Sequence, residues 1–321
     1  MKSQKLKVKT FAFCVLSFVF CAFNFVAKAA NAQTYSVSLW PPLLELIIKP
    51  GKSATQVYKI SNMGDPQILI TKVLPFEPAD NQGNVNILNL PTLLSPLNFS
   101  FQGGDLPLGK AFALKSGENR DLVLKISVPK NTPEKDFYAS FVLETSPEGK
   151  IGQSITQTAA KIAGNILISV SNSLFPAKKG KILEFSSPKI VDSFDAVPFV
   201  LKVENLGDSF FKTFGEIKIE GIFNQSGTVK ILPENILAKT FRDLSLVPWK
   251  EKFIVGPFRA TAEFTLDEKS QENPTPAKLT AQTNFLALPY KAMFALLIII
   301  LILITIKNLP TRINPPSHRT N

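Results

Sequence analysis

Cysteine and histidine are almost absent from this 321-residue chain. The two cysteines are Cys14 and Cys21, and the single histidine is His318. Between residues 33 and 306, therefore, no Ser–His or Cys–His nucleophile pair can form, and no zinc or copper site can be built on His or Cys ligands. Disulfides are excluded there as well, so any folded domain depends on its apolar core. We expect no cofactor and no bound metal.

Acidic residues are missing from both ends of the chain. Residues 1–32 hold five lysines and residues 307–321 hold three bases, with no Asp or Glu in either segment. The remainder has 28 Lys and Arg against 25 Asp and Glu, a net charge of +3 compared with +11 for the whole chain. This nearly balanced middle gives no reason to expect a nucleic-acid partner.

The amino-terminal segment has the three parts of an export signal. Lysines at the start are followed by an apolar run over residues 11–26 and then by small residues that include Ala29, Ala30 and Ala32. Signal peptidase requires small side chains in an A-x-A arrangement, so we expect a signal peptide over residues 1–32, cleaved after Ala29 or Ala32. The alternative is an uncleaved amino-terminal anchor, because the apolar run is slightly long for a signal.

A second apolar run lies near the other end. Residues 292–306 carry no charge and would span about 22 Å as a helix, short of the roughly 30 Å hydrocarbon core. Extending the run back to residue 285 supplies the missing length, which predicts a transmembrane helix over residues 285–306. Tyr290 and Lys291 would flank it on one side, and Lys307 and Arg312 on the other.

The charges at this end predict an orientation in the membrane. Bases without acids on the short tail, residues 307–321, place that tail in the cytoplasm and the bulk of the chain outside the cell. A buried core helix is the alternative for the apolar run, but the run lacks the polar stripe of an amphipathic helix. The chain is therefore expected in the plasma membrane as a single-pass protein, with the lipid bilayer as its first partner.

The rest of the chain has the alternation of β-strands. Apolar side chains occupy every second position in residues 121–129, 197–205 and 260–268, with mostly polar residues between them. Residues 67–76 and 136–144 are more continuously apolar, as in strands buried on both faces. Turn-forming Pro, Gly, Asn and Asp separate the segments at short intervals. We therefore predict an all-β protein built of sandwiches.

A weak internal repeat indicates two such domains. Residues 59–65 and 202–208 share the pattern K-[IV]-x-N-x-G-D at a spacing of about one domain length. This predicts two tandem immunoglobulin-like β-sandwich domains followed by the carboxy-terminal helix. The expected boundaries are a first domain over residues 33–175, a linker over 176–181, a second domain over 182–269 and a polar connector over 270–284.

Two segments carry a family resemblance. Residues 41–65 and 112–145 resemble the amino-terminal immunoglobulin-like module of bacterial WxL-interacting surface proteins and, more distantly, pilus-chaperone-type sandwiches. The similarity covers about residues 38–150, together with the layout of signal, two domains, helix and basic tail. It implies binding to peptidoglycan or to surface proteins. Ser116 stands where the family has Pro before Gly117, and residues 153–172 show no family pattern.

Two local features have competing interpretations. The oxygen-rich stretch over residues 80–84, DNQGN, has the side chains of a calcium loop but not its spacing, and a turn explains it as well. Trp40 and Trp249, each beside proline, could form exposed ligand platforms, but we expect both to pack in the core or at a domain edge.

Taken together, these patterns predict a non-enzymatic, membrane-anchored surface protein for binding or adhesion to cell-wall glycan or to surface-protein partners. The alternative is an extracytoplasmic assembly or chaperone-like factor, which an unpaired apolar edge groove would favour. A carboxylate-dependent glycan hydrolase is a third hypothesis. It requires two acids roughly 5 to 10 Å apart in a cleft.

Overall fold

The computed structural model describes residues 35–103, 107–146, 160–222, 224–269 and 273–308. Most of these residues lie in strands, and a single long helix follows them. Strands of the amino-terminal half are β1 (Val37–Trp40), β2 (Leu43–Ile48), β3 (Ser53–Asn62), β4 (Gln67–Pro78), β5 (Val85–Ile87), β6 (Asn98–Phe101), β7 (Ala111–Leu114), β8 (Asn119–Ser127), β9 (Asp136–Thr145) and β10 (Lys161–Val170), with a short 3-10 helix η1 (Pro91–Leu94) after β5. The second half contains β11 (Gly180–Ser186), β12 (Ile190–Asp192), β13 (Val200–Asn205), β14 (Phe211–Gly221), β15 (Ser226–Ile231), β16 (Asn235–Ile236), β17 (Phe241–Asp243), β18 (Gly256–Leu266), β19 (Lys278–Leu288) and the helix α2 (Tyr290–Lys307).

The amino-terminal sandwich consists of two sheets around one core. Strands run in the order β1-β3-β8-β6 in one sheet and β2-β10-β9-β4-β5 in the other, where β7 also pairs with β4. The expected alternation on β8 is confirmed, since Leu122, Leu124 and Ile126 are all buried. They pack against side chains such as Phe141, which β9 contributes from the opposite sheet.

The first strand of this sandwich divides between the two sheets. β1 pairs antiparallel with β3, and β2 then pairs parallel with β10 in the opposite sheet. Pro41 and Pro42 separate the two halves, and neither proline can donate a backbone hydrogen bond to a ladder. One chain segment therefore contributes to both sheets and closes one side of the sandwich.

The second sandwich repeats this arrangement around its own core. Its first strand also divides, because β11 pairs antiparallel with β13 and β12 pairs parallel with β19. Alternation is again confirmed: Leu201 and Val203 on β13, and Phe264 and Leu266 on β18, point into the core. Trp249 packs in the same core, as expected.

The predicted connector over residues 270–284 and the predicted helix start at residue 285 are wrong. β19 occupies Lys278–Leu288 and pairs with β18 along most of its length. Phe285 and Ala287 are 3% and 0% exposed, so they belong to the core of the second sandwich. Lys278, Thr280, Gln282 and Asn284 lie on the exposed face of this strand, which gives the segment the composition of a linker. At the other boundary, β11 begins at Gly180, inside the predicted linker.

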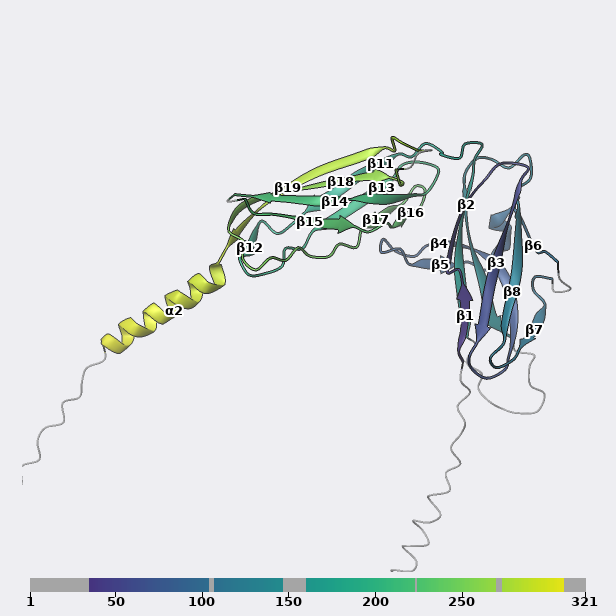
Figure 1. The fold of residues 1–321 in the computed structure, drawn as a ribbon, viewed down its shortest axis with the longest axis horizontal. Coiled ribbons are helices and arrows are strands. Elements are labelled where there is room, and N and C mark those ends of the chain that lie inside the picture. The colour runs from purple at the N-terminus through teal and green to yellow at the C-terminus, as the bar shows by residue number, and fades with distance from the viewer. Residues whose placement is uncertain (1–34, 104–106, 147–159, 223, 270–272, 309–321) are drawn as a thin grey trace, which may run out of the picture.

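Helix α2 is apolar on all sides and none of its side chains is buried. Its mean hydropathy of 2.3 makes it the one helix in the described ranges that could cross a membrane by length and composition. Figure 1 shows that the two sandwiches meet at a steep angle to form an elbow, and that α2 leaves the second sandwich at the end farthest from the elbow.

Candidate functional site: the interdomain elbow

The two sandwiches share a small apolar cluster at the elbow. Phe76 of β4 and Leu167 of β10 come from the outer face of the first sandwich, and Phe210 comes from the loop before β14. All three side chains are at most 8% exposed. Tyr138 and Leu237 pack around them. This contact fixes the second sandwich over the outer face of one sheet of the first.

Buried polar groups extend the contact. The Asp136 carboxylate accepts hydrogen bonds from the backbone N–H of Phe210 at 2.5 Å and from the Tyr138 hydroxyl at 2.8 Å. The Tyr138 oxygen in turn accepts the N–H of Ala238 at 2.8 Å. Burial raises the pKa of Asp136 above its ordinary value of 3.8, while these two donors oppose the rise. Removing a carboxylate from water disfavours its charged form.

A lysine completes this network beside the linker. The Lys178 ammonium donates to the Phe210 carbonyl at 2.6 Å and lies 3.7 Å from Asp267. Burial lowers the pKa of Lys178, and Asp267 acts against that change. The linker itself is thus attached to the second sandwich, which explains how two sandwiches joined by a short segment hold one geometry.

The oxygen-rich residues 80–84 form a turn, as preferred over a calcium loop. Asp80 accepts the N–H groups of Gln82 and Asn84 at 2.9 and 3.1 Å, and the Asn84 amide donates to Asp80 at 2.6 Å. The hydrogen bond from the Asn84 side chain is the main reason that the pKa of Asp80 lies below its ordinary value. Both carboxylate oxygens of Asp80 therefore accept hydrogen bonds from within the turn.

The tip of this turn docks on the second sandwich. The Asn81 carbonyl accepts the N–H of Asp243 on β17 at 2.9 Å, and the Gln82 carbonyl accepts Arg242 Nη2 at 3.3 Å. Gly83 lies against the guanidinium, because a Cβ built there would meet Arg242 Nη2 at 2.3 Å. Its φ of +93° also favours glycine. This turn therefore forms a second contact between the two sandwiches.

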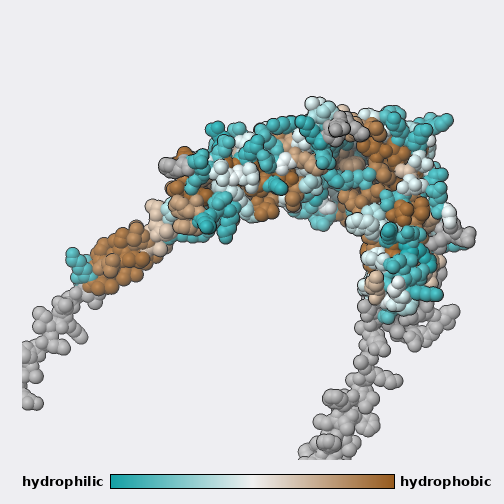
Figure 2. Space-filling view, in the orientation of Figure 1, coloured by the Kyte–Doolittle hydropathy of each residue, from teal (hydrophilic) through white to brown (hydrophobic). Residues whose placement is uncertain are grey.

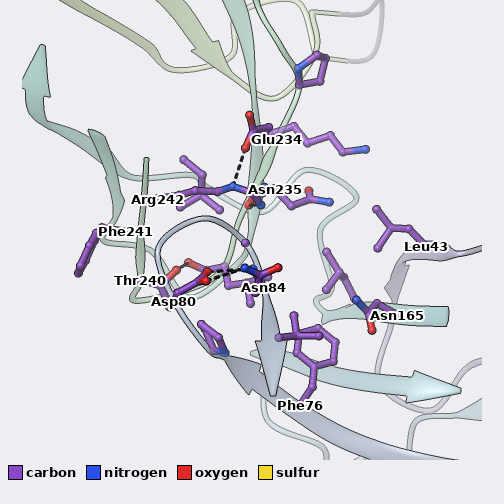
Figure 3. Close-up of a pocket in the computed structure, with 18 residues that line it drawn as sticks. Leu43, Phe76, Asp80, Asn84, Asn165, Glu234, Asn235, Thr240, Phe241 and Arg242 are labelled. Atoms are coloured by element: carbon purple, nitrogen blue, oxygen red, sulfur yellow. Dashed lines mark hydrogen bonds and ion pairs between the residues drawn. The ribbon is translucent and has the colours of Figure 1, made fainter. Parts of the chain in front are cut away.

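A cavity of about 340 Å³ lies between these contacts. Both sandwiches contribute apolar side chains to its lining, and most of its charged side chains come from the second sandwich. Figure 3 shows Leu43 and Phe76 of the first sandwich on one side and Glu234 and Arg242 of the second on the other. Arg242 is held by Glu234 at 2.7 Å and donates to the Asn235 carbonyl at 2.9 Å.

The acids of the cavity do not support the hydrolase hypothesis. Glu234 is ion-paired with Arg242, and the pKa of Asp80 is lowered by its own turn. A glycosidase needs one carboxylic acid with a raised pKa to protonate the leaving group. Asp80 does not have that property, and Glu234 is held in its ion pair with Arg242. The cavity is suited to binding, with apolar surface beside fixed hydrogen-bonding groups.

Strand β2 forms one wall of the elbow and has a free edge. Among the described residues it pairs only with β10. The N–H of Asn165 bonds to the Pro42 carbonyl and that of Ser171 to the Ile48 carbonyl. In a parallel ladder of this register, the backbone groups of Leu43, Glu45 and Ile47 point away from β10. This edge is therefore open to another strand.

The outward side chains of β2 place this edge between two cavities. Leu43 is 41% exposed and lines the first cavity, and Ile47 is 39% exposed and lines a second one of about 380 Å³. Glu45 stands between them, paired with Lys212 at 2.8 Å and accepting the Asn235 amide at 2.6 Å. Leu174 and Phe175 add exposed apolar surface to the second cavity.

The predicted anchor residues lie at the two ends of α2. Tyr290 and Lys307 are its first and last residues. The ammonium of Lys291 lies 2.6 Å from Asp195 of the second sandwich. Arg312 lies outside the described residues, as do the predicted cleavage residues Ala29, Ala30 and Ala32.

The two tryptophans differ. Trp249 is 5% exposed, whereas Trp40 on β1 is 65% exposed, so the packing expectation is wrong for Trp40. Its strand, β1, lies at the edge of its sheet. Arg242 was not among the residues predicted from the sequence. One signal was available: only three arginines stand between residues 33 and 306 of a lysine-rich chain, and arginine is suited to fixed multidentate contacts.

No family model and no curated protein matches the chain. Among solved structures it is similar to the class 5 fimbriae chaperone CfaA, with a TM-score of 0.40 and 11% identity over 77% of this chain and 99% of that chain. It is also similar to the E. coli chaperone DraB, with a TM-score of 0.35 and 14% identity over 78% and 99% of the two chains. A chain from the complex of the Salmonella enterica SafA pilin with the SafB chaperone has a TM-score of 0.35 and 12% identity over 78% and 98%. Similarity of this size does not bear on function.

Proposed function

We propose that this chain is a non-enzymatic, extracytoplasmic assembly or chaperone-like factor, made of two immunoglobulin-like sandwiches and anchored in the plasma membrane by α2. The free edge of β2 in the elbow carries the proposal. A partner would add an extended segment to this edge, bonding to the outward backbone groups of Leu43, Glu45 and Ile47. Export and the cytoplasmic position of the tail are part of the same proposal.

The side chains beside the edge define the kind of segment that fits. Leu43 and Ile47 present apolar surface at the two cavities, and the Glu45–Lys212 ion pair separates them. A bound strand has side chains that alternate between its faces, so every second residue would point toward these cavities. The partner is therefore an exported protein with an exposed strand of alternating apolar residues. Native proteins usually protect such edges, which makes an unprotected apolar one informative.

A photocrosslinking experiment on intact cells tests the proposal. A photoreactive amino acid replaces Leu43 or Ile47 in the full chain, and Ile68 is the matched control. Ile68 is 36% exposed, but its backbone has neighbours on both sides, because it pairs with Ala113 of β7 and its carbonyl accepts the N–H of Ser146. We expect crosslinks to exported proteins from the two β2 positions and few from Ile68. Equal crosslinking from all three positions would contradict capture at the edge.

A proline variant separates edge pairing from folding. Ile47→Pro removes one outward N–H, whereas the bonds to β10 involve the neighbouring residues of β2. Partner recovery should fall several-fold with little loss of stability, since proline is tolerated on the solvent side of edge strands. Retention of the partner by this variant would show that backbone pairing along β2 is not the mode of binding.

Trp40 supports a second candidate function, adhesion to cell-wall glycan. Its indole is 65% exposed beside Pro41 and Pro42, where an aromatic face is free to stack on a sugar. If this function holds, Trp40→Ala lowers the binding of the intact protein to purified cell wall, while Ile47→Pro leaves that binding unchanged. If Ile47→Pro instead lowers this binding and Trp40→Ala leaves it unchanged, the result supports strand capture alone.

A further inference from the structure

The second sandwich is joined to α2 without a flexible linker. β19 ends at Leu288, and α2 begins two residues later at Tyr290. The buried Asp192 carboxylate accepts the backbone N–H of Lys291 at 2.9 Å, so it satisfies one of the unpaired donors of the first helical turn. The Lys291 ammonium also pairs with Asp195 at 2.6 Å. The start of the helix is therefore fixed to the loop that follows β12.

The apolar length of the helix is short for a membrane span. Residues 292–306 are uncharged and cover about 22 Å, against about 30 Å for the hydrocarbon core. Residues 285–288 do not add to this length, because they are part of β19 and alternate residues are buried in the sandwich. A short span that is rigidly attached draws its domain toward the bilayer surface.

The end of the second sandwich beside the helix carries exposed apolar side chains. Phe194 is 52% exposed, Phe253 is 44% exposed, and their rings lie 5.3 Å apart. Phe194 immediately precedes Asp195, the partner of Lys291. Ile222 is a further 41% exposed. We define these three residues as the membrane-proximal patch; hydrophobic surface at this end of the sandwich, next to the helix, is visible in Figure 2.

Hydrogen bonds hold the loops of this patch together. The N–H of Ile254 donates to the Ser193 carbonyl at 3.0 Å, which fixes the loop of Phe253 to that of Phe194. Gln225 reaches the Phe253 carbonyl at 3.3 Å from the turn that follows Ile222. The exposed side chains are thus presented by a fixed framework. Ordered aromatic residues of this kind are common at membrane interfaces.

Basic residues surround the patch. Lys250 and Lys252 are exposed just before Phe253, and Lys189 is exposed before β12. Glu251 is exposed among them, and Asp192 and Asp195 lie beside Lys291 at the same end, so four lysines stand against three acids, a net charge of +1. Exposed lysines at a bilayer surface are attracted to anionic headgroups.

We propose that the membrane-proximal patch of Phe194, Ile222 and Phe253 inserts into the interfacial layer of the bilayer next to α2, with a preference for anionic lipid. The proposal rests on α2 as a membrane anchor. The end of the second sandwich beside α2 would then rest on the membrane, and the elbow at its other end would be held at a fixed height above the bilayer surface.

Single-cysteine labelling of the full chain tests this. In a background without Cys14 and Cys21, an environment-sensitive fluorophore is placed at Phe194→Cys, Phe253→Cys or Leu232→Cys, and the protein is reconstituted into phosphatidylcholine vesicles with or without phosphatidylglycerol. Leu232 is the control, since it is 49% exposed but follows β15 at the end of the sandwich away from the helix. Lipid-borne and water-borne quenchers report depth, and circular dichroism verifies the fold of each variant.

We expect labels at 194 and 253 to be quenched several-fold more by the lipid-borne quencher than the label at 232, and more strongly with phosphatidylglycerol. A fourth label at Leu297→Cys on α2 reports the anchor. Lipid quenching at 297 without quenching at 194 and 253 would overturn the patch and leave the anchor standing. Absence of quenching at 297 would overturn both. Protection from water without lipid quenching would indicate a protein on the patch and also contradict the proposal.

Discussion

Asn62 and Asn205 occupy equivalent positions in the two sandwiches. Each ends the strand that pairs with the first strand of its sandwich, and each is 0% exposed. The Asn62 side-chain oxygen accepts the N–H of Gly64 at 3.0 Å, and that of Asn205 accepts the N–H of Gly207 at 2.8 Å. Their amide groups then bond to backbone carbonyls of a neighbouring strand. The short sequence repeat therefore marks the same buried asparagine turn in both sandwiches.

Replacing either asparagine should destabilise its own sandwich. Asn62→Ala leaves the carbonyls of Asp65 and Leu114 without this donor, and Asn205→Ala does the same for those of Ser209 and Ile236. Unsatisfied buried groups cost about 1–3 kcal/mol, so each variant should lower the free energy of unfolding by that amount in urea titrations.

Asn86→Ala is the control for these variants, because its amide makes only an exposed contact with Glu77. It should change the free energy of unfolding by less than about 0.5 kcal/mol. The effects of the two buried substitutions should add, since they lie in separate cores. Strong non-additivity would contradict independent roles.

Gly83→Ala should loosen the elbow. The added methyl meets the Arg242 guanidinium at 2.3 Å and requires φ of +93°. Overpacking of this kind costs about 1–3 kcal/mol beyond the backbone strain. Spin labels on the two sandwiches should report a broader distance distribution in this variant.

Gly109→Ala controls for the backbone strain alone. Its φ is +84°, and nothing lies within 4 Å of the added methyl. It should cost about 1–2 kcal/mol and leave the distance between the sandwiches unchanged. An equal change of that distance in both variants would argue against the contact with Arg242 as the cause.

Asp136 gives the elbow a dependence on pH. Because burial raises its pKa in the folded protein above 3.8, the folded state binds this proton more tightly than the unfolded state does. The resulting stabilisation is fully present below pH 3.8 and is lost as pH rises through the raised pKa. The free energy of unfolding of the wild type should therefore increase relative to that of Asp136→Asn as pH falls from above the raised pKa of Asp136 toward 3.8. Urea titrations across this pH range measure the difference; a constant difference would show that Asp136 has an ordinary pKa.

We expect the ion pair between Lys291 and Asp195 to fix the orientation of the second sandwich relative to α2, with little effect on the stability of either. The pair is exposed, and solvent screens exposed pairs so that they contribute little to stability. Asp195→Lys should increase the angular freedom of the second sandwich in nanodiscs, measured by fluorescence anisotropy of a label on it. The charge exchange Asp195→Lys with Lys291→Asp should restore the wild-type value, and failure to do so would show that the pair does not set the orientation.

Orientation in the membrane is checked by protease shaving of intact cells. We expect both sandwiches to be digested or released and the segment after Ile306 to stay protected, because bases follow α2 without acids. A tag on the tail reports protection, and permeabilised cells are the control. Loss of the tail from intact cells, with the sandwiches retained, would reverse the topology.

Hydrophobic alternation was sufficient to predict long strands such as β8, β13 and β18, because it is a local property of the chain. Leu122, Leu124 and Ile126 read as one buried face in the sequence, and they form one in the structure. The same logic failed at β19, where polar residues on the wet face resemble a connector. Alternation also gave no indication of the contact between the sandwiches, since Asn81 and Asp243 lie far apart in sequence and neither is unusual by itself.

By itself, the sequence determined that an apolar run lies near each end of the chain, that no disulfide forms between residues 33 and 306, and which side chains of the alternating strands face the core. Composition and period-two alternation are local, so they require no knowledge of distant contacts. Tertiary structure alone decided that β2 pairs parallel with β10 and leaves its other edge free, that Arg242 meets Gly83 across two domains, and that Lys291 pairs with Asp195. Each of these contacts joins segments that are distant in sequence. Such contacts form only once the two cores are packed and meet at the elbow, so no local pattern in the sequence indicates them.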